Sequence, residues 1–295
     1  FSSTGTASVI IACFSTACDS SLDLGNGIGM DLVLIPSGSD PNGRYILSND
    51  FYMMTTEVTQ GMFNEVMGYQ SYSGYSASYG SGTDYPAYYA SWHMAADFAN
   101  AVTNHHNSQN GTSLSACYVC SGSGTSVTCS DAITPYQCDG YRLPTEGEWE
   151  YATRSGTTSE FWTGAGSSLG GTYSSNSCST SVTILDGVSN PLLSDYSWFC
   201  GNSNSSSQPV GQKLPNGVGL YDVHGNLREW TADWYGCSFP PTSTDPYCDS
   251  TSSYRVYRGG RWNSITPHSM RASHRSGLVP TDPDNNLGFR LVLLP

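Results

Sequence analysis

The chain has 295 residues and a mass of 31.6 kDa, which suits one large domain or two small ones with a real hydrophobic core. Only 12% of the residues are charged, and 24 Asp and Glu outweigh 11 Lys and Arg to give a formal net charge of −13. This balance excludes a basic face for nucleic acid and disfavours an anionic membrane surface, and no apolar run is long enough to span a membrane.

The beginning of the chain is predicted to lie outside the main domain. Residues 1–22 form an N-terminal extension in this interpretation, and residues 23–295 form a single domain. The β-branched residues of Thr6–Ile11 suit an edge strand or a tail that pairs with a neighbouring subunit. Because the first residue is Phe1 rather than Met, we expect a processed N-terminus from which a signal peptide has been removed.

Short strands and then helices are predicted in the first half of the domain. Apolar runs place strands at Met30–Ile35, Arg44–Leu47 and Phe51–Met54. A first helix with apolar residues at 58, 63, 66 and 67 ends at Gly68, and a second begins after the N-cap Ser91.

A third helix is predicted from a capping box. Thr145 and Glu148 have the spacing in which each side chain caps a backbone N–H of the other residue. Glu146, Glu148 and Glu150 resemble a set of paired acids for hydrolysis, but their place at a helix start favours a structural role in capping and in the helix dipole.

Ten cysteines, together with abundant Ser, Thr, Gly and Tyr and a single lysine, favour an exported, oxidised protein in an extracellular or periplasmic location. Local pairing predicts bridges Cys13–Cys18, Cys178–Cys200 and Cys237–Cys248. Two more bridges are expected among four cysteines whose connectivity the sequence leaves open: Cys117, Cys120, Cys129 and Cys138. A zinc site in these four is the less favoured alternative, because only one C-x-x-C unit is present.

Helical periodicity disappears after residue 156, and Gly, Ser, Asn and Pro dominate an irregular, turn-rich region. Two strands are predicted to close the chain, at Tyr254–Arg258 and Gly288–Leu294. The first and last strands of the domain are both apolar, so we expect them to pair. The fold class is therefore predicted to be α+β.

Six motifs follow one another in a fixed order along the domain. They are Thr56–Gln60 (TEVTQ), Tyr141–Ala152 (YRLPTEGEWEYA), Pro209–Asn216 (PVGQKLPN), Gly219–Trp230 (GLYDVHGNLREW), Arg258–Trp262 (RGGRW) and Leu287–Arg290 (LGFR). This series resembles the formylglycine-generating-enzyme (sulfatase-modifying factor) domain family from about Gly29 onwards. The resemblance implies a variant of the C-type lectin fold, rich in irregular loops and, in this chain, stapled by disulfides.

The resemblance also implies where an oxidase would bind copper. Oxidase members of the family convert a substrate cysteine to formylglycine with a Cu(I) ion held by two cysteine thiolates shortly after the Gly-Gly motif. Aligned without a gap from Gly259, those two positions are Ser264 and Ser269. Cu(I) is a soft ion that prefers thiolates, whereas a serine hydroxyl is a hard ligand that stays protonated. We therefore expect no copper site and no oxidase activity.

Two arginines stand where the family usually has other residues. Arg228 replaces an aromatic residue before Glu-Trp, and Arg261 replaces a small serine after Gly-Gly. We expect these guanidinium groups to occupy space that an oxidase leaves open for its substrate. The predicted ligand-binding residues are Arg228, Arg261, Trp262, Ser264, His268 and Ser269.

A structural calcium site is the cofactor that the resemblance implies. Its ligands would be the side chains of Asp222 and Glu229 and the backbone carbonyls of Gly225 and Leu227. An oxygen-only set of this kind suits Ca²⁺. The alternative is that Asp222 and Glu229 cap a turn or pair with Arg228.

Other candidate sites have ordinary interpretations. His268 and His274 lie near two arginines and fit hydrogen-bonded histidines better than a metal pair. The Tyr-rich tract Tyr69–Tyr89 suits a binding loop, a subunit contact or a solvated loop about equally. A hydrolase with Ser264 as nucleophile is rejected, because no Gly-x-Ser-x-Gly elbow accompanies it.

These observations favour an exported binding or structural module without copper oxidase activity, one version being a subunit of an extracellular or envelope assembly. Its partner would be a protein, a glycan or a second copy of the chain. One alternative is an enzyme of altered chemistry in periplasmic or extracellular maturation, that is, an oxidoreductase of the formylglycine-generating-enzyme type. The other is a diversified lectin-like protein whose variable residues lie in 261–286. The sequence does not identify the ligand or the oligomeric state.

Overall fold

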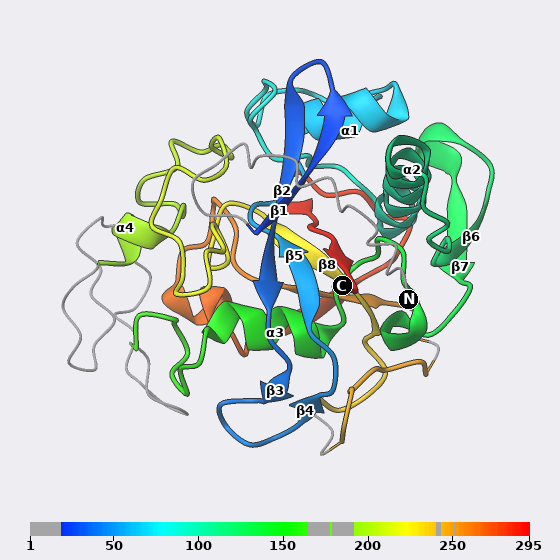
Figure 1. Ribbon diagram of the computed structural model, residues 1–295. Coiled ribbons are helices and arrows are strands. Elements are labelled where there is room, and N and C mark those ends of the chain that lie inside the picture. The colour runs from blue at the N-terminus through cyan, green and yellow to red at the C-terminus, as the bar shows by residue number, and fades with distance from the viewer. Residues whose placement is uncertain (1–18, 165–177, 179–191, 240–242, 251) are drawn as a thin grey trace.

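The computed structural model describes residues 19–164, 178, 192–239, 243–250 and 252–295 (Figure 1). The strand predicted within Thr6–Ile11 and the bridge predicted between Cys13 and Cys18 lie outside these residues.

The first sheet brings the two ends of the described chain together. It contains β1 (Ser20–Gly25), β2 (Ile28–Ile35), β5 (Phe51–Met54) and β12 (Val292–Leu293), in the antiparallel order β1-β2-β5-β12 (Figure 1). The predicted domain boundary between residues 22 and 23 falls inside β1. The expectation that the first and last strands pair is wrong, because β5 lies between β2 and β12 and pairs with both.

Two strands of the second sheet were not predicted from the sequence. Its order is β10 (Arg275–Leu278), β9 (Arg255–Arg258), β8 (Arg228–Trp234) and β11 (Leu287–Gly288), with β11 parallel to β8. The single strand predicted at 288–294 is thus two short strands in different sheets, since Phe289–Leu291 cross from one sheet to the other. One antiparallel sheet and one mixed sheet, together with few helices, confirm the α+β class.

Two hairpins and several short helices complete the fold. The hairpins pair β3 (Gly38–Ser39) with β4 (Ile46–Leu47) and β6 (Tyr118–Ser121) with β7 (Thr128–Asp131). The strand predicted at 44–47 is therefore shortened to its last two residues. The short helices are η1 (Gly124–Ser126), η2 (Pro135–Gln137), α4 (Leu193–Tyr196) and η3 (Pro267–Met270).

All three predicted helices are present, and the second and third begin at their predicted N-caps. The three helices are α1 (Gln60–Met67), α2 (Trp92–Asn110) and α3 (Glu146–Arg154). Gly68 ends α1 in the left-handed conformation, with φ 74°, and the Ser91 side chain accepts a hydrogen bond from the third backbone N–H of α2. Both hydrogen bonds of the Thr145–Glu148 capping box are present at the start of α3.

Three carboxylates of α3 are buried and paired with arginines. Glu146, Glu148 and Glu150 are each at most 1% exposed. Their partners are Arg44, Arg142, Arg154, Arg258 and Arg275. A buried carboxylate needs such partners because its desolvation is otherwise unfavourable by several kcal/mol. The predicted capping role is confirmed for Glu148, whereas the ion pairs of the three acids were not predicted.

Four disulfides staple the described chain. The predicted bridges Cys178–Cys200 and Cys237–Cys248 are confirmed, and the open connectivity resolves into an outer bridge, Cys117–Cys138, and an inner one, Cys120–Cys129. The sulfurs of Cys117, Cys120, Cys129 and Cys138 all lie in disulfides and are not free to bind zinc, so the zinc alternative is wrong.

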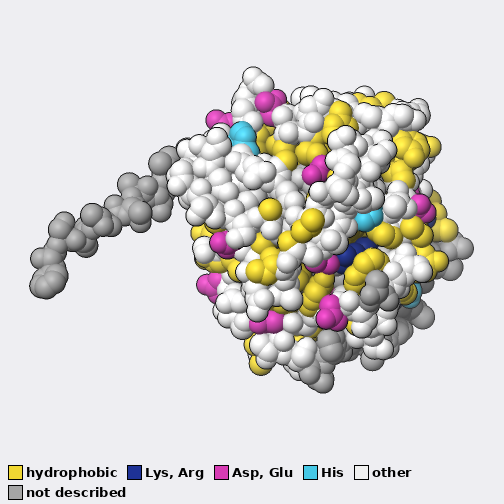
Figure 2. Space-filling view, turned by 90° about the vertical axis from the view of Figure 1, so that its right-hand side faces the viewer, with side chains coloured by type: hydrophobic (Ala, Val, Ile, Leu, Met, Phe, Trp, Pro, Cys, Tyr) yellow, Lys and Arg dark blue, Asp and Glu magenta, His cyan; other side chains and the backbone are white. Residues whose placement is uncertain are grey.

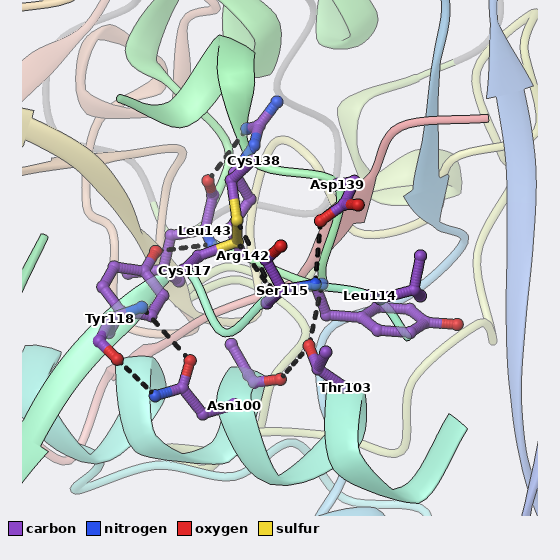
Figure 3. The surroundings of a disulfide bond; sticks show 12 residues. Asn100, Thr103, Leu114, Ser115, Cys117, Tyr118, Cys138, Asp139, Arg142 and Leu143 are labelled. Carbon is purple, nitrogen blue, oxygen red and sulfur yellow. Dashed lines mark hydrogen bonds between the residues drawn. A yellow bond between two sulfur atoms is a disulfide. The ribbon is translucent and has the colours of Figure 1, made fainter. Parts of the chain in front are cut away.

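Hydrogen bonds to α2 hold the outer bridge in place. Figure 3 shows Asn100 of α2 bonded twice to the backbone of Tyr118, at 2.8 and 3.2 Å, next to Cys117. On the other side of the bridge, the Asp139 carboxylate accepts the backbone N–H of Ser115 at 2.8 Å. The loop is thus fastened to the core by a covalent bond and by polar contacts.

The surface reflects the acidic composition. On the face drawn in Figure 2 the acidic side chains are scattered, and basic side chains of the described residues come into view at one place only. Among the described residues, no helix has both the length and the apolar character needed to cross a bilayer.

Candidate functional site

The Gly-Asn turn before β8 organises a buried cluster of carboxylates. Asp222 and Asn226 both have positive φ, 61° and 60°, so the backbone reverses sharply between them. Glu57 accepts hydrogen bonds from the Asn226 side chain and the Leu227 backbone N–H, each at 2.8 Å. Glu229, the second residue of β8, lies beside them.

Glu229 is held by two donors. Its Oε1 and Oε2 accept hydrogen bonds from Arg290 at 2.7 Å, and Oε2 also accepts the indole N–H of Trp149 at 2.8 Å. The alternative in which Glu229 pairs with Arg228 is therefore not observed, and Arg290 is the partner of Glu229.

Three buried carboxylates lie near one guanidinium in this cluster. Glu57, Asp222 and Glu229 are each at most 1% exposed. Arg290 forms an ion pair with Glu229, and its charge also acts on Glu57 and Asp222. Burial and then the charges of Asp222 and Glu229 raise the pKa of Glu57. Burial raises the pKa of Asp222 to about 6 against the hydrogen bond from the Gly211 N–H.

The predicted calcium ligands can be tested against this geometry. Asp222 Oδ2 accepts the Gly211 N–H at 2.8 Å, while Asp222 Oδ1 is buried without a hydrogen-bond partner in the described structure. An orphaned carboxylate oxygen in a cluster with excess negative charge suits a hard cation. Glu229 Oε1 has one lone pair left beside its bond to Arg290. Within the described residues no three carboxylate, histidine or cysteine side chains are placed to hold a metal by themselves. A Ca²⁺ ion at Asp222 and Glu229 would therefore need the backbone carbonyls of Gly225 and Leu227 as well, and the ion remains a proposal.

The loop after β9 is shaped by two glycines. Gly259 has φ 75°, which only glycine adopts without strain, and it turns the chain out of the strand. A Cβ on Gly260 would lie 2.5 Å from the side chain of Met270. The Trp262 N–H then donates to the carbonyl of Asn226 at 2.7 Å, which ties this loop to the Gly-Asn turn.

The two serines at the expected copper positions are neighbours. The Ser269 hydroxyl donates to Ser264 Oγ at 3.2 Å and to the Thr266 carbonyl at 3.1 Å. Ser264 Oγ also accepts the Arg261 backbone N–H at 3.1 Å. The pair is a neutral hydrogen-bonded arrangement, without a thiolate.

These serines line a cavity of about 420 Å³, which we call the arginine cavity. Its polar lining comes from the start of β8, the loop after β9, and β10, and includes Arg228, Arg261, Ser264, Ser269, His274 and Ser276. Four of the six predicted ligand-binding residues are thus brought together. Trp262 packs behind the cavity in an aromatic cluster, and His268 lies outside it in contact with Arg271 at 2.9 Å.

The two arginines of the cavity are partnered differently. Arg228 pairs with Asp284 at 2.8 Å and donates to Tyr257 and Asn286. Arg261 donates to the Asn286 side chain at 3.2 Å and has no carboxylate within ion-pair distance among the described residues. Burial and then the nearby Arg228 charge lower the pKa of Arg261.

Three polar atoms of the lining are buried without a partner in the described structure. They are Arg228 Nε, Asn263 Oδ1 and His274 Nδ1. Burial, and then surrounding positive groups that begin with His268, lower the pKa of His274 to about 4, so its ring is neutral at pH 7. Such orphaned groups are uncommon in folded proteins and mark places where a ligand or water completes the hydrogen bonding.

The Tyr-rich tract packs beside this region. Tyr79 stacks on Trp262 with ring centroids 5.6 Å apart, and Tyr75 stacks on Tyr89 at 4.4 Å. Tyr75 is 51% exposed, while Tyr88 is fully buried. Residues 73–78 and 81–84 of the tract are exposed, while its rings at Tyr79 and Tyr88 pack in an aromatic cluster against the loop after β9.

Several residues of the site were not named individually from the sequence. Asn263, Thr266 and Ser276 line the cavity, and Asp284 pairs with Arg228, and all of them lie within the predicted range 261–286. Ser276 lies at the cavity because β10 pairs with β9, and no local sequence pattern predicts that pairing. Glu57 could have been identified as a candidate site residue from the sequence, since it lies in the first of the six motifs.

Comparison with known proteins places the chain in a family. A model of the sulfatase-modifying factor enzyme 1-like domain matches residues 26–294. The chaperone protein LppX of Paenibacillus barcinonensis is 29% identical over 254 residues, 79% of this chain and 79% of that protein. The formylglycine-generating enzyme of Streptomyces coelicolor is 31% identical over 169 residues, 56% of this chain, and the match spans 50% of the enzyme.

Solved structures share the fold over nearly the whole length. Treponema denticola variable protein 1 superposes with a TM-score of 0.70 at 24% identity, covering 94% of this chain and 99% of that one. PvdO from Pseudomonas aeruginosa superposes with a TM-score of 0.62 at 18% identity, covering 95% and 100%. The expected C-type-lectin-like architecture is therefore present, and the chain belongs to the sulfatase-modifying factor enzyme 1-like domain family.

Proposed function

We propose that this chain is an exported, non-oxidase binding module that receives its ligand in the arginine cavity and carries a structural Ca²⁺ at the Asp222 cluster. The observation that supports the first part is the hydroxyl pair Ser264–Ser269 at the two expected copper positions. Neutral hydroxyls 3.2 Å apart offer a Cu(I) ion no soft ligand, while the same cavity presents donors and acceptors to a polar ligand.

The likeness to a protein named as a chaperone gives further support. The LppX match covers 79% of both chains, whereas the match to the formylglycine-generating enzyme spans half of that enzyme. Four disulfides in the described chain agree with an oxidising compartment.

The metal part is tested on purified protein dialysed against a chelator. Metal analysis is expected to find Ca²⁺ after re-addition but no Cu(I), and Ca²⁺ should raise the melting temperature because it binds the folded state. Asp222→Asn should abolish this rise, and Asp249→Asn, an exposed control, should keep it. An unchanged calcium response in Asp222→Asn would remove the calcium site. Stoichiometric Cu(I) binding or thiol-dependent oxygen consumption by the wild type would overturn the non-oxidase assignment.

A gain-of-function variant sharpens the copper test. In Ser264→Cys/Ser269→Cys two thiols would stand where the hydroxyls now lie 3.2 Å apart. The reduced double variant is expected to bind one Cu(I), because two adjacent thiolates suit that ion.

The binding part is tested by filling the cavity. Ile265 lines it and is 55% exposed, so Ile265→Trp should block entry while the protein still folds. Leu214→Trp at a 48% exposed position that does not line the cavity is the matched control. Glycan and peptide arrays should give ligands that Ile265→Trp loses and Leu214→Trp keeps. If every ligand found binds Ile265→Trp as well as wild type, the arginine cavity is not the binding site.

A further inference from the structure

Among the described residues, the arginine cavity is lined by two guanidinium groups and by no acidic side chain. Arg228 is neutralised by Asp284, but Arg261 is half-buried and has no carboxylate partner in the described structure. This occurs in a chain whose formal net charge is −13, where acidic groups are plentiful. Arg261 is partly withdrawn from water and lies beside the positive charge of Arg228, an arrangement that favours a counter-charge and points to an anionic ligand.

The size of the charge imbalance indicates which anion. Two guanidinium groups face one carboxylate here, because Asp284 pairs with Arg228 while its charge also acts on Arg261, and no described acidic side chain lines the cavity. A single carboxylate would balance one guanidinium and match its planar, forked geometry. A phosphate dianion would leave excess negative charge.

The rest of the lining indicates what carries the carboxylate. Asn263 Oδ1 is an acceptor and Arg228 Nε a donor, and both are buried without partners. Hydroxyls of Ser264, Thr266 and Ser269 lie around them, and Tyr257 and Ile265 supply the larger apolar groups among the lining side chains. A peptide side chain would use larger apolar anchors, whereas a ring bearing several hydroxyls supplies donors and acceptors together.

On the basis of the proposed function, we infer that the arginine cavity binds an acidic sugar, with its carboxylate on Arg261 and its hydroxyls on the Asn263 and serine side of the cavity. The cavity volume of about 420 Å³ falls within the usual range for small-molecule sites, roughly 300–1,000 Å³.

The experiment measures binding of free sugars to the full chain by calorimetry and by ligand-observed NMR. D-glucuronate and N-acetylneuraminate are expected to bind and D-glucose is not, and binding should weaken with added salt. Arg261→Gln should weaken glucuronate binding about tenfold to a hundredfold, because a charge-assisted hydrogen bond is lost. Arg271→Gln, which removes the same charge outside the cavity, should bind as wild type.

A measurement on the unaltered protein guards against a variant that fails to fold. Phenylglyoxal modifies accessible arginines, and glucuronate should protect Arg261 but not Arg271 when the products are mapped by mass spectrometry. Equal binding of glucose and glucuronate, unchanged binding in a folded Arg261→Gln, or no protection of Arg261 would overturn the inference.

Further arms separate this inference from the proposed function. An N-acetylated tripeptide with a free carboxyl terminus and inorganic phosphate are titrated in parallel. Competitive binding of either one without any acidic sugar overturns the sugar assignment while the cavity remains a binding site. Loss of an array ligand in Ile265→Trp with no binding of acidic sugars has the same meaning.

Discussion

At the scale of single residues, this protein depends on ion pairs that are out of reach of solvent. Glu150 accepts hydrogen bonds from Arg44 and Arg154 at 2.7 Å and from Arg258 at 2.8 Å. Burial alone would raise the pKa of Glu150, but the charges of Arg258, Arg154 and Arg44 outweigh it and lower the pKa to about 2. The carboxylate is therefore ionised in the folded state under all ordinary conditions.

Glu150→Gln is expected to destabilise the protein by about 3–5 kcal/mol, because three guanidinium groups lose their shared counter-charge. The folded pKa of about 2 lies below the unfolded value of 4.5, so the stabilisation is fully present above about pH 4.5 and is lost as the pH falls towards 2. Urea unfolding at several pH values measures both effects. Asp249→Asn should change stability by less than about 0.5 kcal/mol, and an equal loss in the two variants would contradict the ion-pair argument.

Residues of the candidate site were predictable to different extents. Ser264, Ser269, Arg228 and Arg261 were placed from an ordered series of motifs, and the cavity unites them. His268 was predicted as a ligand-binding residue with them but does not line the cavity, because sequence proximity does not show on which side of η3 a side chain lies. The partners of the arginines come from distant segments, so no local pattern could reveal them.

At the scale of elements, local signals located helices far better than strands. The caps at Ser91 and Thr145 placed the starts of α2 and α3 because side chain and backbone interact within three residues. β8 was missed because Arg-Glu-Trp-Thr-Ala-Asp-Trp shows no alternation of polar and apolar residues. Its charged side chains are held in ion pairs and hydrogen bonds within the protein. The strand therefore lacks the alternation of polar and apolar residues that a strand with one solvent-exposed face shows.

The turn after β9 offers a test with a close control. Gly259→Ala forces a left-handed conformation on alanine and places its Cβ 3.3 Å from the Trp149 ring. Gly124→Ala also has a positive φ, 60°, but meets nothing within 4 Å. We expect about 1–2 kcal/mol of destabilisation from the backbone at each site, and about 1–3 kcal/mol more from overpacking at Gly259. Thermal unfolding measures the difference, and equal losses would show that the Trp149 contact is unimportant.

At the scale of the whole molecule, short elements are held together by long-range connections. Each hairpin or strand pair is small, and the disulfides fasten the irregular segments to the core. The fold class, the family and the bridges Cys178–Cys200 and Cys237–Cys248 could be predicted from the sequence, whereas the connectivity of the other four described cysteines could not. The order of the strands in the sheets could not be predicted, because β5 and β12 pair although most of the sequence lies between them.

The nested bridges should contribute unequally to stability. The outer bridge, Cys117–Cys138, spans 21 residues and is almost fully buried, whereas the inner bridge, Cys120–Cys129, spans 9. Replacing both cysteines of a bridge by alanine should cost about 2–4 kcal/mol, and loop entropy alone makes the outer bridge worth about 0.8 kcal/mol more. Denaturant unfolding of the two double variants checks this order. A larger loss for the inner pair would mean that the hairpin β6–β7 matters more than loop closure.

The segment Leu287–Leu293 has a consequence for how the protein is made. Its two ends add β11 to one sheet and β12 to the other, so neither sheet is complete until this segment has left the ribosome. Until then the growing chain presents the unpaired edges of β5 and β8, and open edges of this kind pair readily with other chains. A product truncated before Leu287 would keep both edges open and would aggregate rather than fold.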